Sequence, residues 1–256
     1  MNWVTWLDID LSLIAPALLA GALVLSTHVP LGHEVLKRGI IFIDLAIAQI
    51  AALGVIAAIV FGGELAGWQI QFFAALSAIL GASLIYWLEQ HYQETLEAII
   101  GILFVLAASG GLILVSYAPH SDELLHDLLV GQILWVNSQQ LLWIAILYIP
   151  LLMLWFSNVS KHPIFFYLIF SSAVTASVQL VGIYLVFASL ILPALACRNI
   201  AKRNKRLFLA YSIGFLGYLL GIFVSLLSDI PTGAIIVWTL LVLSLLIKPI
   251  LNRLAN

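Results

Sequence analysis

Long apolar stretches separated by short polar segments make up almost the whole chain. A helix needs about 20 apolar residues to cross a bilayer, and runs of that length recur from one end to the other. They lie at 11–31, 39–61, 68–88, 97–117, 133–157, 207–227 and 232–251. The pattern predicts an all-α polytopic membrane protein, because a spanning helix satisfies its own backbone polar groups in lipid.

One further apolar stretch, 163–197, has an ambiguous length. Its 35 residues are too many for one straight span and slightly too few for two. Gly182, near the middle, is a candidate bend, and Pro193 lies near the end. One crossing here gives about eight helices in all, and two short crossings give about nine.

The distribution of positive charge decides between these topologies. Half of the chain's 10 Lys and Arg residues lie in one short segment: Arg198, Lys202, Arg203, Lys205 and Arg206. Lys and Arg accumulate in the cytoplasmic loops of membrane proteins. Two crossings in 163–197 place all ten on one side, whereas one crossing moves seven of them to the other side. We therefore predict about nine crossings, with the N-terminus outside and the C-terminus in the cytoplasm.

Composition supports the membrane assignment and narrows the function classes. The chain is 64% hydrophobic and 9% charged, with a mean hydropathy of +1.16, which no soluble fold of this length accommodates. Asp8 and Asp10, without a positive residue ahead of them, argue against a cleavable signal peptide. A single cysteine, Cys197, excludes an internal disulfide. We expect one transmembrane domain over 1–256, with membrane lipid around it and no nucleic-acid partner.

Catalytic signatures do not occur in the sequence. It has no phosphate-binding loop, no zinc-protease motif and no nucleophile elbow. The loops are also too short to hold a soluble domain. We therefore expect no enzymatic activity in this chain, and any ATPase must be a separate chain.

Two polar residues stand inside the apolar run 39–61. Asp44 is the costlier, since a carboxylate in a membrane helix costs a few kcal/mol unless it faces protein or water. It either lines a cation path or pairs with Lys37 or Arg38, one to two turns earlier. Gln49 gives a weaker signal, because an amide at this depth also serves to bond a neighbouring helix.

A second group of polar residues lies between the predicted fourth and fifth helices, on the outer side. Asp122 and His126 are four residues apart, and Glu123 and His126 are three apart, so either pair shares a helix face. Together with His120, they offer the imidazole and carboxylate ligands that suit zinc or manganese. The alternative is a solvated acidic loop. The other histidines form no site by spacing: His28, His33, His91 and His162 are placed at the cytoplasmic side.

Four stretches in order resemble one transporter family. The segment Gly182–Ala196, GIYLVFASLILPALA, resembles the late-helix signature of the ABC-3 family, the permease subunits of bacterial zinc, manganese and iron ABC importers. The first inner loop with its Phe42–Gly54 helix, the start of the fourth helix at Glu97–Leu103, and Asp229–Gly233 before the last helix fit the same family. The resemblance covers most of the chain.

This resemblance implies a set of partners and a function. The partners are a second copy of the chain, which forms a permease homodimer in the bacterial inner membrane, cytoplasmic ATPase chains, and a periplasmic metal-binding protein that docks outside. The chain would form the path for zinc or manganese, bind no cofactor of its own and catalyse nothing. The alternatives are a channel-like or regulatory subunit of the same fold that does not pump, and a permease for an organic metal chelate or vitamin.

The sequence departs from the family pattern at two places. The family's second helix carries an Asp and, four residues later, a His, which form a metal stop in the pore; here Leu45 and Gln49 stand there. Asp44 is displaced by one residue, which turns a helical side chain by about 100°. The inner loop after the fifth helix, which in the family contains a coupling helix, is only 157–163. Either coupling to an ATPase uses another surface, such as Ala201–Arg206 or the acidic turn 89–97, or the chain is a divergent member of the family with altered coupling.

Overall fold

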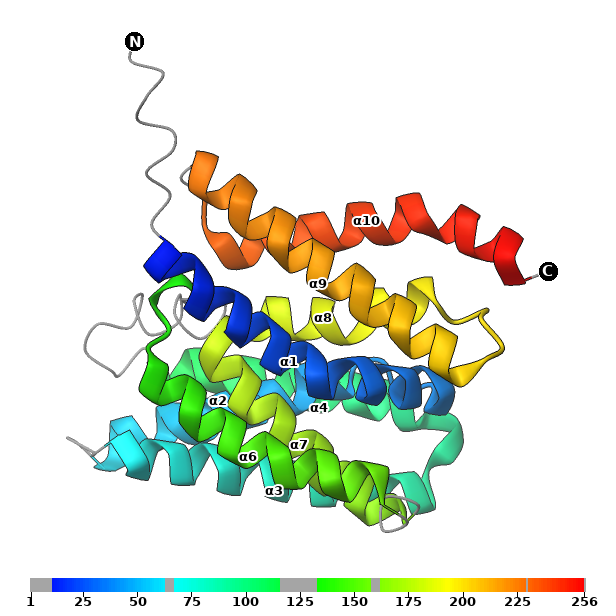
Figure 1. The fold of residues 1–256 in the computed structure, drawn as a ribbon. Helices are drawn as coiled ribbons and strands as arrows, with labels where there is room; N and C mark the ends of the chain where they lie inside the picture. Colours follow the sequence, from blue (N-terminus) through cyan, green and yellow to red (C-terminus); the bar gives the residue numbers. More distant parts are fainter. Residues whose placement is uncertain (1–10, 63–66, 116–132, 158–161, 229, 256) are drawn as a thin grey trace.

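The structure, a computed structural model, describes residues 11–62, 67–115, 133–157, 162–228 and 230–255. Across these residues the chain is all-helical, as predicted (Figure 1). Eight of the described helices are long and apolar enough to span a membrane, and α8 is a shorter apolar helix. The main helices are α1 (Leu11–Arg38), α2 (Ile43–Gly62), α3 (Gly67–His91), α4 (Leu96–Val115), α6 (Ser138–Phe156), α7 (Pro163–Val181), α8 (Ile183–Ala196), α9 (Arg203–Ser228) and α10 (Thr232–Ala255). Two 3₁₀ turns, η2 (Gln93–Thr95) and η3 (Ile133–Trp135), precede α4 and α6.

The ambiguous stretch 163–197 forms two helices that break at Gly182. This residue has a φ of +79°, a conformation that glycine adopts at little steric cost. Its N–H donates to the Val178 carbonyl at 2.8 Å, which closes α7 before α8 begins. The two helices run in opposite directions (Figure 1), so the predicted division of this stretch into two short helices is confirmed. At 14 residues, α8 is about 21 Å long.

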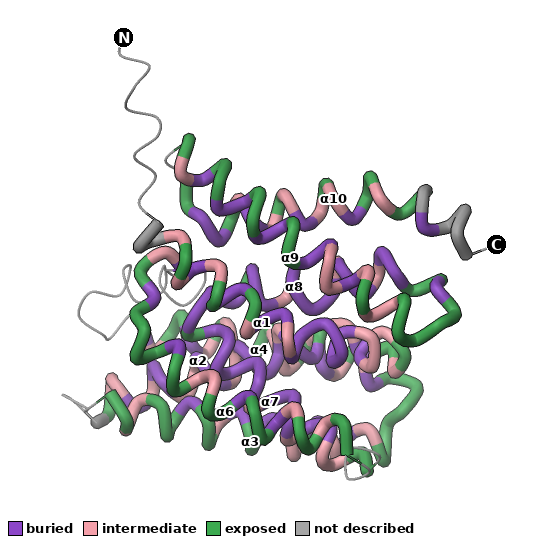
Figure 2. Tube along the Cα trace, viewed as in Figure 1, coloured by how far each residue is buried: buried purple, intermediate pink, exposed green. Residues whose placement is uncertain are grey.

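The helices pack in two groups that do not follow chain order. Helices α8 and α9 pack with α1 from the opposite end of the sequence, and α10 packs on α8 and α9. Helix α2 packs with α3 and α4, and α3 packs with α7. Helix α6 contacts both α1 and α7. Burial is concentrated on α7 and α8, as Figure 2 shows, while α3, α4, α6 and α10 expose large apolar side chains to lipid or to a partner.

Glycines allow the closest helix contacts. A Cβ atom added at Gly32 of α1 would lie 2.0 Å from the Leu190 carbonyl oxygen of α8. One added at Gly54 of α2 would lie 1.9 Å from the Ser77 Oγ of α3. Both pairs of helices therefore approach to backbone distance, the packing mode that small residues permit in membranes.

The end of α1 and the start of α2 lie at other residues than the sequence predicted. Helix α1 continues to Arg38, well past the predicted end of its apolar run at residue 31. Gly39, with a φ of +71°, then ends it by donating its N–H to the Val35 carbonyl at 3.0 Å. Helix α2 starts only at Ile43, so Asp44 lies in its first turn rather than deep in a helix that begins at residue 39.

Candidate functional site

Asp44 is buried without a partner. Its exposed fraction is 1%, and neither carboxylate oxygen has a hydrogen-bond partner. The predicted alternative, an ion pair with Lys37 or Arg38, is wrong, because both cations bind other carboxylates. The Arg38 guanidinium lies 3.1 Å from Glu34 and 3.3 Å from Glu89, and the Lys37 Nζ lies 3.9 Å from Glu34.

The surroundings of Asp44 compensate little of its charge. A carboxylate in the first turn of a helix is stabilised by the helix dipole by about 0.3–1 kcal/mol. Taking a charge out of water costs several kcal/mol. This desolvation cost favours the binding of either a proton or a metal cation at Asp44. One carboxylate is not a complete metal site, and the described residues contain no cluster of three His, Cys, Asp or Glu side chains.

Gln49 does not join Asp44 in a common site. The two residues are five positions apart on α2, so their side chains are separated by about 140° around the helix axis. Gln49 instead shares a face with Leu45 and Leu53, and all three are half-buried. The three remaining predicted metal residues, His120, Asp122 and His126, lie outside the described residues.

His28 is a candidate ligand that the sequence analysis missed. It lies inside α1 with no exposed surface rather than at a cytoplasmic loop. Its Nδ1 lies 2.9 Å from the Val24 carbonyl, an acceptor, which assigns the hydrogen to Nδ1 and leaves a lone pair on Nε2. Nε2 is buried and has no hydrogen-bond partner. A neutral imidazole with a free nitrogen is the form of histidine that binds metals.

Polar side chains from several helices meet near His28. Thr27 Oγ1 lies 3.0 Å from the His28 ring and also interacts with the Tyr148 hydroxyl of α6. Tyr148 donates to the Ala173 carbonyl at 3.1 Å and forms a hydrogen bond with Ser177 of α7. In sequence, these residues are isolated hydroxyls in apolar runs, and only the tertiary packing brings them together.

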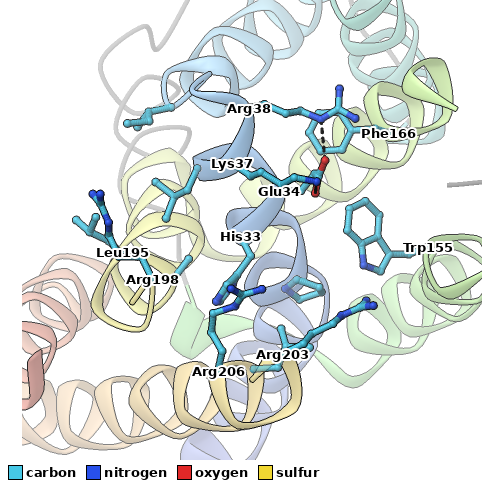
Figure 3. A pocket seen from close by; sticks show the side chains of 15 residues that line it. His33, Glu34, Lys37, Arg38, Trp155, Phe166, Leu195, Arg198, Arg203 and Arg206 are labelled. Atoms are coloured by element: carbon cyan, nitrogen blue, oxygen red, sulfur yellow. Dashed lines mark hydrogen bonds and ion pairs between the residues drawn. The ribbon is translucent and has the colours of Figure 1, made fainter. Parts of the chain in front are cut away.

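A large cavity opens at the end of the bundle where α1, α6 and α8 finish and α7 and α9 begin. Its volume is about 1020 Å³. Figure 3 shows cationic side chains reaching it from α1, from the segment after α8 and from α9. The cations that line it are Lys37, Arg38, Arg198, Arg203 and Arg206. Their meeting at one end confirms that these five positive charges lie on one side; we call it the basic end.

The acidic turn 89–97 is partly tied into this end of the molecule. Glu89 of α3 holds Arg38 of α1, and that guanidinium also lies 4.3 Å above the Phe166 ring of α7. Glu97 Oε1 accepts the Phe42 N–H at 3.2 Å, just before α2. Only Glu94 of the three glutamates is exposed without such a contact. The turn therefore braces the α1–α2 connection rather than lying free in solvent.

A second cavity, of about 680 Å³, lies between α3, α6 and α7. Amides and hydroxyls line it beside two tryptophans: Gln71, Gln140, Thr175, Gln179, Trp68 and Trp143. Thr175 Oγ1 is buried and unpartnered. This cavity carries no charged side chain and is therefore chemically distinct from the basic one.

Comparison with known proteins gives one family. A model of the ABC 3 transport family matches residues 10–162 and 157–250. The manganese import system permease protein ScaB of Streptococcus parasanguinis is 29% identical over 249 residues, which cover 88% of this chain and 83% of that protein. The manganese transport system membrane protein MntC of Listeria monocytogenes is 28% identical over 231 residues, covering 81% and 79%.

Other similarities are shorter or structural. A protein of Chlamydia muridarum named "Probable metal transport system membrane protein" is 29% identical over 184 residues, and the chain spans 63% of its length. The structure of PsaBC from Streptococcus pneumoniae in complex with Fab superposes with a TM-score of 0.75. The match covers 96% of each chain at 22% identity, which establishes a shared fold.

Proposed function

The chain belongs to the ABC-3 transport family, and on this premise we propose that it is the permease subunit of an ABC importer for a divalent transition metal. It is a multi-pass protein of the bacterial inner membrane, with its apolar helices as the membrane-embedded body. In the proposal, residues 1–256 act as one permease domain that provides the path and holds no resident cofactor. A separate ATPase supplies the energy.

Asp44 is the observation that carries this proposal. It is a buried carboxylate with no hydrogen-bond partner, and it lies on the helix where the family resemblance places a metal stop. Ionisable residues retained inside membrane proteins mark ion pathways. The ion pairs of Lys37 and Arg38 with other carboxylates remove the structural explanation for this one.

Manganese is the cargo that we propose first, and zinc second. Manganese prefers oxygen ligands. Gln49 has an amide oxygen where the family resemblance leads one to expect a histidine, and Asp44 has a carboxylate on another face of the same helix. Two relatives are named for manganese transport. His120, Asp122 and His126 remain a proposed collecting site on the outer side.

We also propose the partners of an importer: a second copy of the chain, a cytoplasmic ATPase and a periplasmic metal-binding protein. The positive-inside rule places the basic end in the cytoplasm, where the ATPase must dock. Since Glu89 and Glu97 are engaged within the chain, we propose that among the described residues the ATPase contacts Glu94 and the exposed residues of the segment 201–205.

A second candidate is a subunit of the same fold that does not pump metal. The replacement of the family's Asp and His by Leu45 and Gln49 favours it, because an amide is a poorer ligand than an imidazole. Purification from detergent discriminates the two functions. An importer permease should bring an ATPase chain with it, and a subunit outside any ABC transporter should not.

The direct test is metal uptake by cells that depend on this chain. Asp44→Asn removes the charge and keeps the size, and Glu34→Gln makes the same chemical change at a carboxylate that is already paired. At matched membrane levels, we expect Asp44→Asn to lower manganese accumulation at least about tenfold, the effect of about 1.4 kcal/mol. Glu34→Gln should retain uptake. Unchanged accumulation of both manganese and zinc in Asp44→Asn would overturn the proposed role of Asp44.

A further inference from the structure

The basic cavity carries far more positive than negative charge. Five of the chain's 10 Lys and Arg residues line it, against a single carboxylate, Glu34. Glu34 is already shared by Lys37 and Arg38, and Arg38 has Glu89 as a second partner. The charge of the remaining cations is therefore not balanced by these carboxylates.

Three arginines account for this excess. Within the described residues, no acidic side chain forms an ion pair with Arg198, Arg203 or Arg206. Arg206 Nε is buried and has no hydrogen-bond partner. Figure 3 shows the Arg206 side chain extending from α9 toward His33 of α1. Arg198 and Arg203 are exposed and Arg206 is half-buried. Like charges around one cavity repel one another, so a bound anion would stabilise the arrangement.

The excess positive charge also argues against this cavity as a binding site for a metal ion. A divalent metal ion that entered it would meet five positive charges and one carboxylate that is already engaged. Coulomb repulsion therefore disfavours a cation in this cavity. The cavity is therefore not where the cargo of the proposed importer would rest, and it calls for a different ligand.

The geometry of the cations favours phosphate. Arginine binds phosphate through two parallel N–H donors, and three arginine side chains line this cavity. Arg203 and Arg206 also stand in the first turn of the long helix α9, whose N-terminal N–H groups and dipole favour an anion. A phosphate group would satisfy several of these donors at once.

The apolar part of the lining points to the source of that phosphate. Trp155, at the end of α6, contacts the Phe166 ring, and both line the cavity together with Leu207. Tryptophan at a helix end is typical of the membrane interface. Basic pockets between transmembrane helices on the cytoplasmic side bind anionic phospholipid headgroups. We propose that this cavity is a binding site for a phosphate-bearing anion, supplied by an anionic phospholipid of the cytoplasmic leaflet.

The test compares two double variants with equal charge loss. Arg203→Gln with Arg206→Gln removes two cations from the cavity lining, and Lys202→Gln with Lys205→Gln removes two exposed cations from the same segment that do not line it. Purified full-length protein is titrated with phosphatidylglycerol, and with phosphatidylcholine of the same acyl chains. Bound lipid is followed by native mass spectrometry. Should the first variant fail to insert, Arg203→Lys with Arg206→Lys keeps the charge and loses the bidentate geometry.

We expect phosphatidylglycerol to bind the wild type and the lysine variant more tightly than phosphatidylcholine does. In the Arg203, Arg206 variant its affinity should fall roughly thirtyfold, since each cation near an anionic headgroup contributes a factor of about five. Inorganic phosphate forms a second arm. If it binds the wild type, the variant loses that binding, and the lipid shows no preference, the anion site stands with free phosphate as its source.

Two results would overturn the inference. One is equal binding of both lipids and of phosphate by all variants. The other is intact lipid binding in the arginine variant together with loss of an ATPase from the purified complex, which would make the cavity a protein-docking surface. Because the assay reads lipid and phosphate, its failure would leave the proposed metal transport untouched.

Discussion

Glu34 and Asp44 lie ten residues apart on either side of one tight turn, and they differ in burial and in ion pairing. Glu34, at the end of α1, is half-buried and binds Arg38 at 3.1 Å and Lys37 at 3.9 Å. Asp44, in the first turn of α2, is almost fully buried and has no partner for either oxygen. Lys37 and Arg38 are near both carboxylates in sequence. They follow Glu34 by three and four residues in the same helix, and both pair with it.

This difference indicates a structural role for Glu34 and a functional role for Asp44. Glu34 is explained by its contacts, because it joins α1 to Arg38, which Glu89 ties to α3. Asp44 makes no contact that would repay the cost of burying its charge. A residue that lowers stability without structural compensation is expected at a functional position. Substitutions at the two sites should therefore change stability in opposite directions, and only the substitution of Asp44 should weaken metal binding.

The largest effect is expected where α1, which carries Glu34, is held against α8. Gly32→Ala places a Cβ 2.0 Å from the Leu190 carbonyl oxygen, so the helices must separate. We expect a loss of about 1–3 kcal/mol in the free energy of unfolding, measured as thermal unfolding of the purified protein. Gly101→Ala on α4 is the control, since nothing lies within 4 Å of its added Cβ. Equal unfolding midpoints for both variants would refute the close α1–α8 contact.

A smaller loss is expected from the paired carboxylate. Glu34→Gln removes the charged partner of Lys37 and one of the two partners of Arg38. The stability should fall by about 1.5 kcal/mol, the low end for hydrogen bonds to charged groups, because Arg38 keeps Glu89. Thermal unfolding measures this, and adding Glu89→Gln should deepen the loss. A Glu34→Gln protein as stable as the wild type would contradict the structural role assigned to Glu34.

The smallest change is expected at Asp44, with the opposite sign. Asp44→Asn replaces a buried carboxylate without a partner by a neutral amide of similar size. The free energy of unfolding should rise by about 1 kcal/mol, since an unpaired charge costs more to bury than an amide. The measurement is again the unfolding midpoint in metal-free detergent solution. A lowered midpoint would mean that the carboxylate has a stabilising partner after all.

Much of this fold could be predicted from the sequence, because bilayer-spanning helices leave long apolar runs. The break at Gly182 followed from length and charge together. The start of α2 could not be predicted, because residues 40–43 are apolar and hide the turn that Gly39 initiates. The burial of Asp44 could be predicted, but its lack of a partner could not, since Arg38 binds Glu89 from 51 positions away.

The arrangement of the polar residues inside the bundle could not be predicted from the sequence either. His28 stands in an apolar run like any isolated histidine, and nothing in the sequence indicates which ring nitrogen is left free. The hydrogen bond to Val24 and the contact with Thr27 fix the ring. The cavity cations also come from separate segments that only tertiary packing unites.

Direct binding of manganese to the purified chain tests the central claim, that Asp44 is unpaired because it meets a metal. The free Mn²⁺ concentration is measured during titration of wild-type, Asp44→Asn and Glu34→Gln proteins in the same detergent. We predict that the wild type and Glu34→Gln bind alike, and that Asp44→Asn binds at least about tenfold more weakly, the effect of about 1.4 kcal/mol. Equal affinity of Asp44→Asn and wild type would contradict the account.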